Sequence, residues 1–347
     1  MTALPRLGCL GVGWIGLSRL ASLATSGAAS IVAVCDPNPE ACARAREIVP
    51  DARVLEHYEE LLELPLDGVV IATPSGLHAR QCIDALERGH AVFCQKPLAP
   101  SAREVERVLA TARAVNRLLR VDFCYRHTRA LSMARELLAS GELGTIHSVE
   151  LVFHNAYGPE KAWATDPALS GGGCLMDLGV HLVDAALWAL GSPRVERAVG
   201  RRFREGRQLP AHATEVEDLA MGLFDLEGGV SASLACSWWS SFGDHARIRA
   251  EFLGTRGGVV VENVAGSFYD FACDRLRNGS RERLVSPPDD WGGRALVSFA
   301  EELRVSAANR PQPELLEVAR AVDLLYGRTA LEAGASGPER LDAIGVS

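Results

Sequence analysis

The chain has 347 residues and a formal net charge of −8, and its length exceeds the usual size of a single hydrophobic core, which predicts two domains. Hydrophobic residues make up 48% of the sequence and charged residues 23%, a soluble globular composition that excludes a fibrous or disordered chain. The negative charge offers no general attraction to nucleic acid or to an anionic membrane, and no apolar run reaches the roughly 18 residues of a membrane span, so we expect a small-molecule partner.

Nine cysteines are spread singly through apolar runs such as Leu7-Gly8-Cys9-Leu10. Their spacing matches neither a disulfide framework nor a zinc site. We therefore expect core cysteines in a reducing compartment, which predicts a cytoplasmic protein without a structural metal.

Short β-branched runs alternate with helical patterns through the first 125 residues, at 7–10, 31–35, 68–72, 91–94 and 118–124. Such alternation predicts an α/β domain with a doubly wound parallel sheet. Between the last two runs, Ser101 and Glu104 have the spacing of a helix capping box, and apolar residues follow at helical period. We assign residues 1–125 to this first domain.

Residues 126–347 show a different pattern and are assigned to a second, α+β domain. Long alternating strands are expected at 145–155, 195–204, 216–226, 230–239, 247–253 and 258–262, which predicts one large, mostly antiparallel, open-faced sheet. Helices are expected at 131–140, 178–190, 293–307 and 313–332. In the strand at 230–239, small residues alternate with apolar ones, and such a flat face favours pairing of subunits into a homodimer or homotetramer.

A glycine pattern follows the first strand in Gly11-Val12-Gly13-Trp14-Ile15-Gly16. In this position the first glycine makes a tight turn, the second lets a pyrophosphate approach the backbone, and the third lets the helix pack on the strand. Asp36 ends the next strand, where a carboxylate can bind both hydroxyls of an adenosine ribose. The pattern predicts a Rossmann domain that binds NAD, with NADP as the alternative cofactor. A plain glycine turn, with Asp36 capping a helix, is the competing interpretation.

Two further motifs lie where strands of the first sheet end, at the edge at which open α/β sheets bind ligands. Thr73-Pro74 with His78 follows one strand, and Gln95-Lys96 follows the next. Of the 36 basic residues, only Lys96 and Lys161 are lysines. Arginine cannot release its proton whereas a buried lysine can, so a lysine retained at this edge indicates proton chemistry rather than a solvated loop cation.

Asp177 and His181 lie at the start of the helix at 178–190, behind the run Gly171-Gly172-Gly173. Four residues apart, the two side chains share one helix face, and a carboxylate that binds one imidazole nitrogen leaves the other nitrogen for proton transfer. A capping aspartate and a core histidine are the alternative interpretation. We expect the glycine run to let a ligand approach the backbone.

Together these motifs resemble the Gfo/Idh/MocA family of glucose-fructose oxidoreductase and inositol dehydrogenase, over residues 6–262. The resemblance rests on motifs that recur in the expected order: the glycine pattern, Thr73-Pro74 with His78, Lys96 before proline, Tyr125-Arg126, and the glycine run with Asp177 and His181. It implies that Lys96, Asp177 and His181 form the catalytic group. The family usually has glutamate where this chain has Gln95, and loss of that charge would let Lys96 titrate lower.

The motifs also give a set of expected ligand contacts. Those to the cofactor are expected from Gly11, Gly13, Trp14, Ile15, Gly16, Asp36, Thr73, Pro74, His78, Gln95 and Lys96. Candidates for the wall of the substrate pocket are Tyr125, Arg126, Asn155, Lys161, Trp163 and Trp239. We expect the loop that carries Lys161 and Trp163 to cover the substrate.

The activity implied by the resemblance is hydride transfer between NAD(P) and a hydroxyl or ketone of a sugar, cyclitol or related polyol. His181, oriented by Asp177, would take the hydroxyl proton while Lys96 polarises the oxygen, and the sequence leaves open how the two residues divide these roles. A redox-assisted glycosidase or lyase and a non-catalytic dinucleotide sensor are the alternatives on the same fold. The presence of all three residues weighs against the sensor, which needs no proton transfer.

Overall fold

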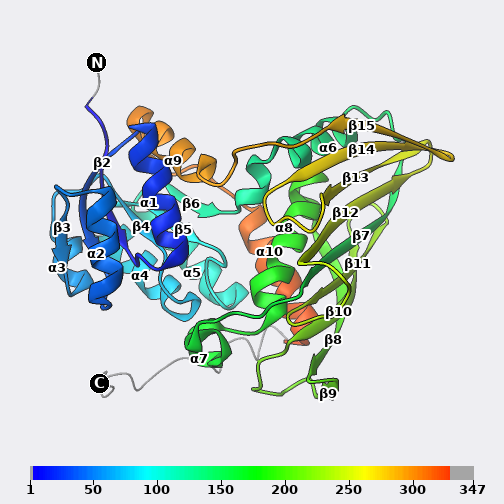
Figure 1. Cartoon of the computed structure of the whole chain (residues 1–347), viewed down its shortest axis with the longest axis horizontal. Coiled ribbons are helices and arrows are strands. Elements are labelled where there is room, and N and C mark those ends of the chain that lie inside the picture. Colours follow the sequence, from blue (N-terminus) through cyan, green and yellow to red (C-terminus); the bar gives the residue numbers. More distant parts are fainter. Residues whose placement is uncertain (1–2, 329–347) are drawn as a thin grey trace.

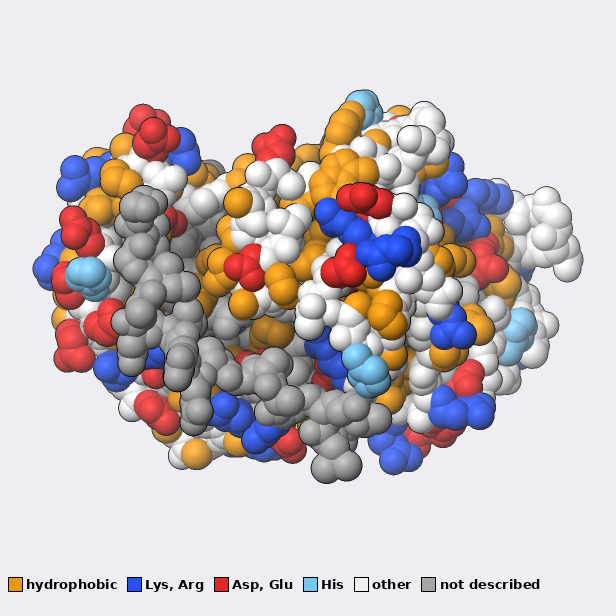
Figure 2. Space-filling view, turned by 90° about the horizontal axis from the view of Figure 1, so that it is seen from below, with side chains coloured by type: hydrophobic (Ala, Val, Ile, Leu, Met, Phe, Trp, Pro, Cys, Tyr) orange, Lys and Arg blue, Asp and Glu red, His pale blue; other side chains and the backbone are white. Residues whose placement is uncertain are grey.

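The structure, a computed structural model, describes residues 3–328 and arranges them as two lobes side by side (Figure 1). The last part of the expected closing helix, residues 329–332, lies outside the described residues. None of the described helices is long and apolar enough to cross a membrane. On the face seen in Figure 2, acidic and basic side chains are interspersed over both lobes.

Six parallel strands form the sheet of the first lobe, in the order β3-β2-β1-β4-β5-β6. The strands are β1 (Arg6–Leu10), β2 (Ser30–Cys35), β3 (Arg53–Leu55), β4 (Gly68–Ile71), β5 (Ala91–Gln95) and β6 (Leu119–Asp122). This doubly wound order confirms the predicted α/β fold. Successive strands are added on one side of β1 up to β3 and on its other side from β4 onward, and such sheets bind ligands at this switch point. The sequence pattern does not reveal β3, because three residues are too few to show periodicity.

Helices connect these strands: α1 (Trp14–Ser26), α2 (Pro39–Ile48), α3 (Tyr58–Leu62), α4 (Ser75–Glu87) and α5 (Ala102–Ala114). Helix α5 begins at the predicted capping box. The Ser101 hydroxyl accepts a hydrogen bond from the backbone N–H of Glu104 at 3.3 Å and donates to its carboxylate at 2.8 Å, which satisfies one free donor of the first turn.

Nine strands form the sheet of the second lobe, in the order β15-β14-β13-β12-β7-β11-β10-β8-β9. They are β7 (Ile146–Asn155), β8 (Val195–Arg204), β9 (Arg207–Leu209), β10 (Leu219–Leu226), β11 (Val230–Ser237), β12 (Ala246–Gly254), β13 (Gly257–Asn263), β14 (Phe271–Arg277) and β15 (Ser280–Val285). Neighbouring strands are antiparallel except β11 and β7, which are parallel. The predicted mostly antiparallel sheet is confirmed, and β9, β14 and β15 extend it.

Helices α6 (Arg129–Ala139), α8 (Val180–Ala189) and α10 (Glu314–Tyr326) cover the face of this sheet that looks toward the first lobe (Figure 1). Along β11, Val230, Ala232 and Leu234 are buried under these helices, whereas Ser231 on the other face is exposed. The open face also carries three large apolar side chains, each more than half exposed: Val199, Met221 and Leu223.

Helix α9 (Arg294–Val305) returns from the second sheet to the first lobe. Its residues Leu296 and Phe299 belong to the hydrophobic core that contains Leu7 and Phe93 of the first sheet. This helix therefore completes the first core although it lies within residues 126–347, which the sequence pattern assigns to the second domain. The domain boundary at residue 125 stays a prediction. Helix α9 follows this boundary in the sequence but packs on the first sheet.

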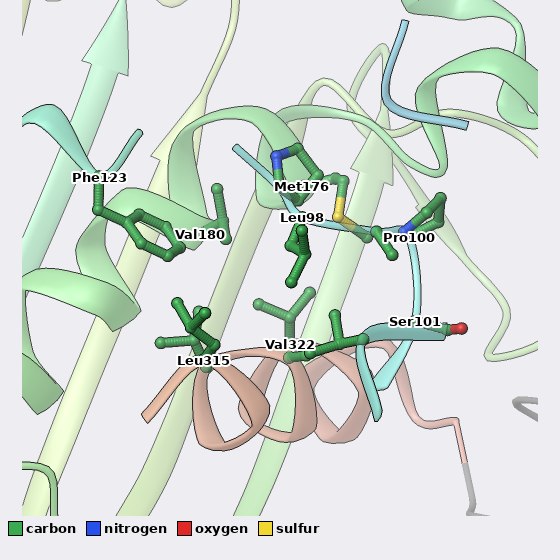
Figure 3. A pocket seen from close by; sticks show the side chains of 13 residues that line it. Leu98, Pro100, Ser101, Phe123, Met176, Val180, Leu315 and Val322 are labelled. Carbon is green, nitrogen blue, oxygen red and sulfur yellow. The ribbon is translucent and has the colours of Figure 1, made fainter. Parts of the chain in front are cut away.

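An apolar seam joins the lobes behind the edge of the first sheet (Figure 3). Leu98 comes from the segment after β5, Met176 from the π-helical turn η3 (Leu175–Gly179), and Leu315 and Val322 from α10. Their side chains point toward one another across a small pocket whose lining contains no ionisable side chain. The seam thus fixes the backbone beside Lys96 in one lobe and Asp177 in the other.

We expect Phe299→Ala to lower the free energy of unfolding by about 3–5 kcal/mol, because truncating a buried aromatic side chain leaves a cavity. Phe299 is 1% exposed, and its ring centroid lies 5.5 Å from that of Phe93. Urea denaturation followed by circular dichroism measures the change. Val305→Ala, at the 79% exposed end of the same helix, is the matched control. A loss below about 1 kcal/mol would show that α9 does not contribute to the first core.

Candidate active site

The glycine pattern forms the turn between β1 and α1, as predicted. Gly11 has a φ of +84°, and a Cβ placed on it would lie 2.6 Å from the carbonyl group of Ala72. A Cβ on Gly16 would lie 2.2 Å from the carbonyl oxygen of Gly11. The fold itself therefore requires glycine at both positions.

Gly13 differs from these two glycines. It is the N-cap of α1 with a φ of −65°, and no side chain caps the helix. A Cβ placed on Gly13 would meet only the Nζ atom of Lys161, at 3.7 Å. The protein alone would tolerate a side chain here, so the open space at the uncapped helix N-terminus fits the phosphates of a dinucleotide.

Asp36 follows β2 beside this turn. Its Oδ2 atom accepts a hydrogen bond from the backbone N–H of Val12 at 2.8 Å, and Oδ1 accepts one from that of Asn38 at 2.9 Å. Each carboxylate oxygen keeps a second lone pair for a ribose hydroxyl. Asp36 thus both tightens the turn and fits the adenosine ribose of the predicted cofactor.

His78 holds two loops together. The side chain is buried, with Nδ1 2.7 Å from the carbonyl oxygen of Pro97 and Nε2 2.8 Å from that of Thr73. Burial lowers the pKa of His78, and the two carbonyl groups partly oppose this shift. Both ring nitrogens contact the backbone, so His78 positions the Thr73 and Lys96 loops and leaves no ring nitrogen for a ligand.

Lys96 pairs with Asp177 across the lobes. Its Nζ donates to Oδ1 of Asp177 at 2.7 Å and to the carbonyl oxygen of the same residue at 2.8 Å. The other oxygen, Oδ2, accepts from Nε1 of Trp238 at 3.2 Å. The expectation that Asp177 contacts the imidazole of His181 is wrong, because the carboxylate is directed at Lys96 and Trp238 and forms no hydrogen bond with that ring.

His181 lies in a nearly apolar environment at the start of α8. Its ring centroid is 4.8 Å from that of Tyr125, edge to face, and 6.5 Å from that of Phe153. Burial, followed by the positive charges of Lys96 and Arg19, lowers the pKa of His181 well below 6.5. No described residue forms a hydrogen bond with the imidazole, so this neutral ring is free to accept a proton.

Gln95 faces away from Lys96. Its amide donates to Oδ2 of Asp122 at the end of β6, and the same oxygen accepts from Nε of Arg19 at 2.5 Å. All three side chains are buried. The amide of Gln95 thus supports an ion pair between α1 and β6, whereas a carboxylate at this position would repel Asp122.

The glycine run packs against protein. A Cβ on Gly172 would lie 2.1 Å from the hydroxyl of Tyr326, and one on Gly173 would lie 1.9 Å from the carbonyl oxygen of Glu217. The buried Glu217 carboxylate accepts from the backbone N–H groups of Gly173 and Leu175, at 3.1 and 3.0 Å, and from Tyr326 at 2.7 Å. The expectation that these glycines admit a ligand is wrong, because Tyr326 and Glu217 of the same chain fill the space beside them.

Arg126 also has a role inside the protein. Its guanidinium binds both carboxylate oxygens of Asp184, at 2.5–3.1 Å, and one of Glu314 at 3.2 Å. Burial raises the pKa of Asp184, and the guanidinium of Arg126 opposes only part of that shift. This network joins the segment after β6 to α8 and α10, and it leaves Arg126 little capacity to bind a substrate.

Of the remaining pocket candidates, Asn155 ends β7, Trp239 follows β11, and Lys161 and Trp163 lie in the segment after β7. Asn155 has a buried Oδ1 atom without a hydrogen-bond partner among the described residues, which marks an acceptor available to a ligand. Trp239 is 49% exposed and adjoins Trp238, the partner of Asp177, with ring centroids 5.8 Å apart. Lys161 extends over Trp163, with Nζ 5.6 Å from the ring centroid.

Several residues of the site carry no clear signal in the sequence: Arg19, Asp122, Glu217 and Trp238. Asp122 ends a strand at the same edge as Lys96, and that position could have singled it out. Arg19 is hidden by the abundance of arginine. Among residues 3–328, no group of histidine, cysteine, aspartate and glutamate side chains could hold a metal ion.

Two family models match the chain. A model described as an oxidoreductase family with an NAD-binding Rossmann fold matches residues 6–123. A model of the GFO/IDH/MocA C-terminal domain matches residues 131–260.

Named relatives extend over nearly the whole chain. A dTDP-3,4-didehydro-2,6-dideoxy-alpha-D-glucose 3-reductase of Saccharopolyspora spinosa is 30% identical and covers 86% of this chain and 86% of its own. An inositol 2-dehydrogenase of Streptomyces avermitilis is 28% identical and covers 95% of this chain and 99% of its own. The crystal structure of KijD10, a 3-ketoreductase from Actinomadura kijaniata in complex with NADP and TDP-benzene, shares the fold with a TM-score of 0.79, 24% identity and coverage of 93% of this chain and 97% of that chain.

We expect Asp36→Ala to weaken NAD binding by about tenfold or more, which corresponds to about 1.4 kcal/mol. NADP binding should weaken less, because its phosphorylated ribose cannot use the carboxylate in the same way. Calorimetric titration with each dinucleotide measures both dissociation constants, and Asp67→Ala, another carboxylate that accepts a backbone hydrogen bond, is the control. Equal losses for both dinucleotides would show that Asp36 acts only by holding the turn.

Proposed function

The chain belongs to the Gfo/Idh/MocA family of NAD(P)-dependent oxidoreductases, and on this basis we propose that it interconverts a hydroxyl and a ketone on a sugar, cyclitol or related polyol. Membership confirms the resemblance seen in the sequence. The observation that carries the proposal is the Lys96 ammonium, which Asp177 holds at 2.7 Å close to the buried, neutral His181.

In the oxidation direction, the substrate hydroxyl lies between Lys96 and His181. Lys96 donates a hydrogen bond to the hydroxyl oxygen and stabilises the negative charge that develops there. His181 accepts the hydroxyl proton, and a carbonyl group forms as the carbon loses hydride. The bound nicotinamide supplies the hydride acceptor, or the donor in the reverse direction. Asp177 fixes the direction of the Lys96 ammonium with two of its oxygens.

The polyol class is supported by polar and aromatic groups that end β7, follow β11 and lie in the segment after β7. The unpaired Oδ1 of Asn155 can accept from a substrate hydroxyl, while Trp163 and Trp239 offer flat apolar surfaces to the C–H face of a ring. The named relatives that act on hexose derivatives and inositol support the same class.

A panel of sugars and inositols, incubated with the purified protein and NAD, tests the proposal through the absorbance of NADH. Net NADH formation that Lys96→Arg abolishes is the expected result, because arginine keeps the charge but not the compact shape. Release of a leaving group without net NADH would instead identify a redox-assisted glycosidase or lyase. Dinucleotide binding without any turnover would identify a sensor.

We expect kcat/KM for oxidation to stay constant as the pH falls to 6.5 and to decline only below it. The pKa of His181 lies well below 6.5, so the ring remains a neutral base at 6.5 and loses activity only when acid protonates it. A pH profile of kcat/KM with any substrate of the panel measures this limb. His147→Gln, which removes an exposed histidine of β7, should leave the profile unchanged. An acid limb centred above 6.5 would exclude His181 as the base.

We also propose that two or four subunits associate through the open face of the second sheet, in the cytoplasm. Leu223 and Val199 lie opposite each other on β10 and β8, and both are more than half exposed, which favours burial against a second copy. All nine cysteines are buried and unpaired, as thiols of a reducing compartment are.

Leu223→Lys should convert the oligomer into monomers, because a buried unpaired ammonium opposes association. Light scattering at micromolar concentration measures the mass. Val305→Lys, at an apolar residue that is even more open to solvent on α9, should leave the mass unchanged. A wild-type monomer, or an oligomer unaffected by Leu223→Lys, would reject this interface.

A further inference from the structure

The segment from 156 to 170, here called the strap, leaves the second sheet and crosses to the first lobe. Its start is tied to the second lobe by two backbone hydrogen bonds, from Ala156 to His245 at 3.0 Å and from Ser240 to Asn155 at 2.9 Å. The ring of Trp239 packs directly on Gly158, where a Cβ would lie 1.9 Å from ring carbons. The strap is therefore fixed where it begins.

The far end of the strap contacts the first lobe. Its short helix α7 (Pro167–Ser170) packs against α4. A Cβ on Gly76, in the first turn of α4, would lie 2.2 Å from the carbonyl oxygen of Ala168. Asp166 caps α7 through the backbone N–H of Ala168 at 2.9 Å. This close packing of α7 on α4 holds the end of the strap against the first lobe.

Lys161 lies between these two attachments. Its Nζ atom is 3.7 Å from the position of a Cβ on Gly13 and 5.6 Å from the ring centroid of Trp163. Within residues 3–328, this ammonium has neither a hydrogen bond nor an ion pair. Partial burial lowers the pKa of Lys161, while Asp177 and Asp36 act in the opposite direction. The charges of both carboxylates thus reach this cation, which has no ion-pair partner among residues 3–328.

These two carboxylates identify the part of the dinucleotide that Lys161 faces. Asp36 marks the adenosine ribose, and the Lys96–Asp177 pair marks the reacting end. A dinucleotide that spans them places its pyrophosphate in the middle, beside Gly13. The fold requires glycine at Gly11 and Gly16 but not at Gly13, so the space under Lys161 is room for a ligand.

We propose that Lys161 binds the pyrophosphate of the dinucleotide from the second lobe, opposite the N-terminus of α1. This inference rests on the dinucleotide binding of the proposed function and adds a residue from the second lobe. It replaces the expectation that Lys161 contacts the polyol. The helix N–H groups bind the phosphates from one side, and the ammonium neutralises their charge from the other.

The test is equilibrium binding without any polyol. Lys161→Ala should raise the dissociation constants of NADH and ADP by about tenfold and weaken their dependence on salt, because one phosphate contact is lost. Affinity for adenosine, which has no phosphate, should not change. Lys161→Arg keeps the charge and should bind NADH within about threefold of the wild type. Arg304→Ala removes an exposed cation at the end of α9 and should have no effect.

Unchanged affinity of Lys161→Ala for NADH and ADP would overturn the inference, and a raised polyol KM at saturating NAD would then restore the substrate contact. Equal losses for adenosine and ADP would also overturn it, since they would indicate a distorted site. These outcomes are separate from the polyol panel. If no polyol is oxidised, the proposed function fails while a selective loss of ADP binding still supports Lys161. A wild-type protein that binds neither NADH nor ADP would overturn both.

Discussion

The ion pair between Lys96 and Asp177 is the contact on which the site depends. It joins the loop after β5 in the first lobe to the turn before α8 in the second lobe. Two oxygens of Asp177 hold Nζ, at 2.7 and 2.8 Å. The Asp177 side chain is 43% exposed, so the pair adds little to stability through charge alone. Its effect is geometric: Asp177 holds the ammonium in place, and the positive charge of Lys96 adds to the burial that lowers the pKa of His181. The ion pair thus positions Lys96 and contributes to the low proton affinity of the neighbouring ring.

Glycines in this chain serve two different purposes that the sequence alone does not distinguish. Gly11, Gly16 and Gly173 are required because other protein atoms would collide with a side chain. At Gly13 only the end of a flexible lysine lies within reach. The atoms that lie against a glycine come from residues distant in the sequence, as Glu217 is from Gly173. A local glycine pattern therefore predicts that something lies close to the backbone, but not whether it is protein or ligand.

The sequence predicts the parts of the fold that depend on local periodicity and chain order. The alternation of runs predicts the first sheet, the capping box at Ser101 predicts the start of α5, and the scarcity of lysine points to Lys96. The pairing of side chains is less predictable. Asp177 and His181 have the spacing of helix partners, yet a lysine 81 residues away takes the carboxylate. Similarly, α9 has the pattern of any amphipathic helix, and only packing shows that it joins the first core.

Both lobes contribute residues to the site, so binding of the dinucleotide and binding of the polyol can influence each other. Strand β7 carries Phe153, which contacts the His181 ring at 6.5 Å between centroids, and the strap begins directly after the same strand. A pyrophosphate bound by Lys161 on the strap would favour the arrangement in which the lobes are joined, and in that arrangement Lys96 also meets Asp177. Binding energy gained at the phosphates is then available to hold the reacting groups in place. A polyol that favours the same arrangement then strengthens dinucleotide binding. By thermodynamic linkage, the dinucleotide must strengthen polyol binding by the same factor.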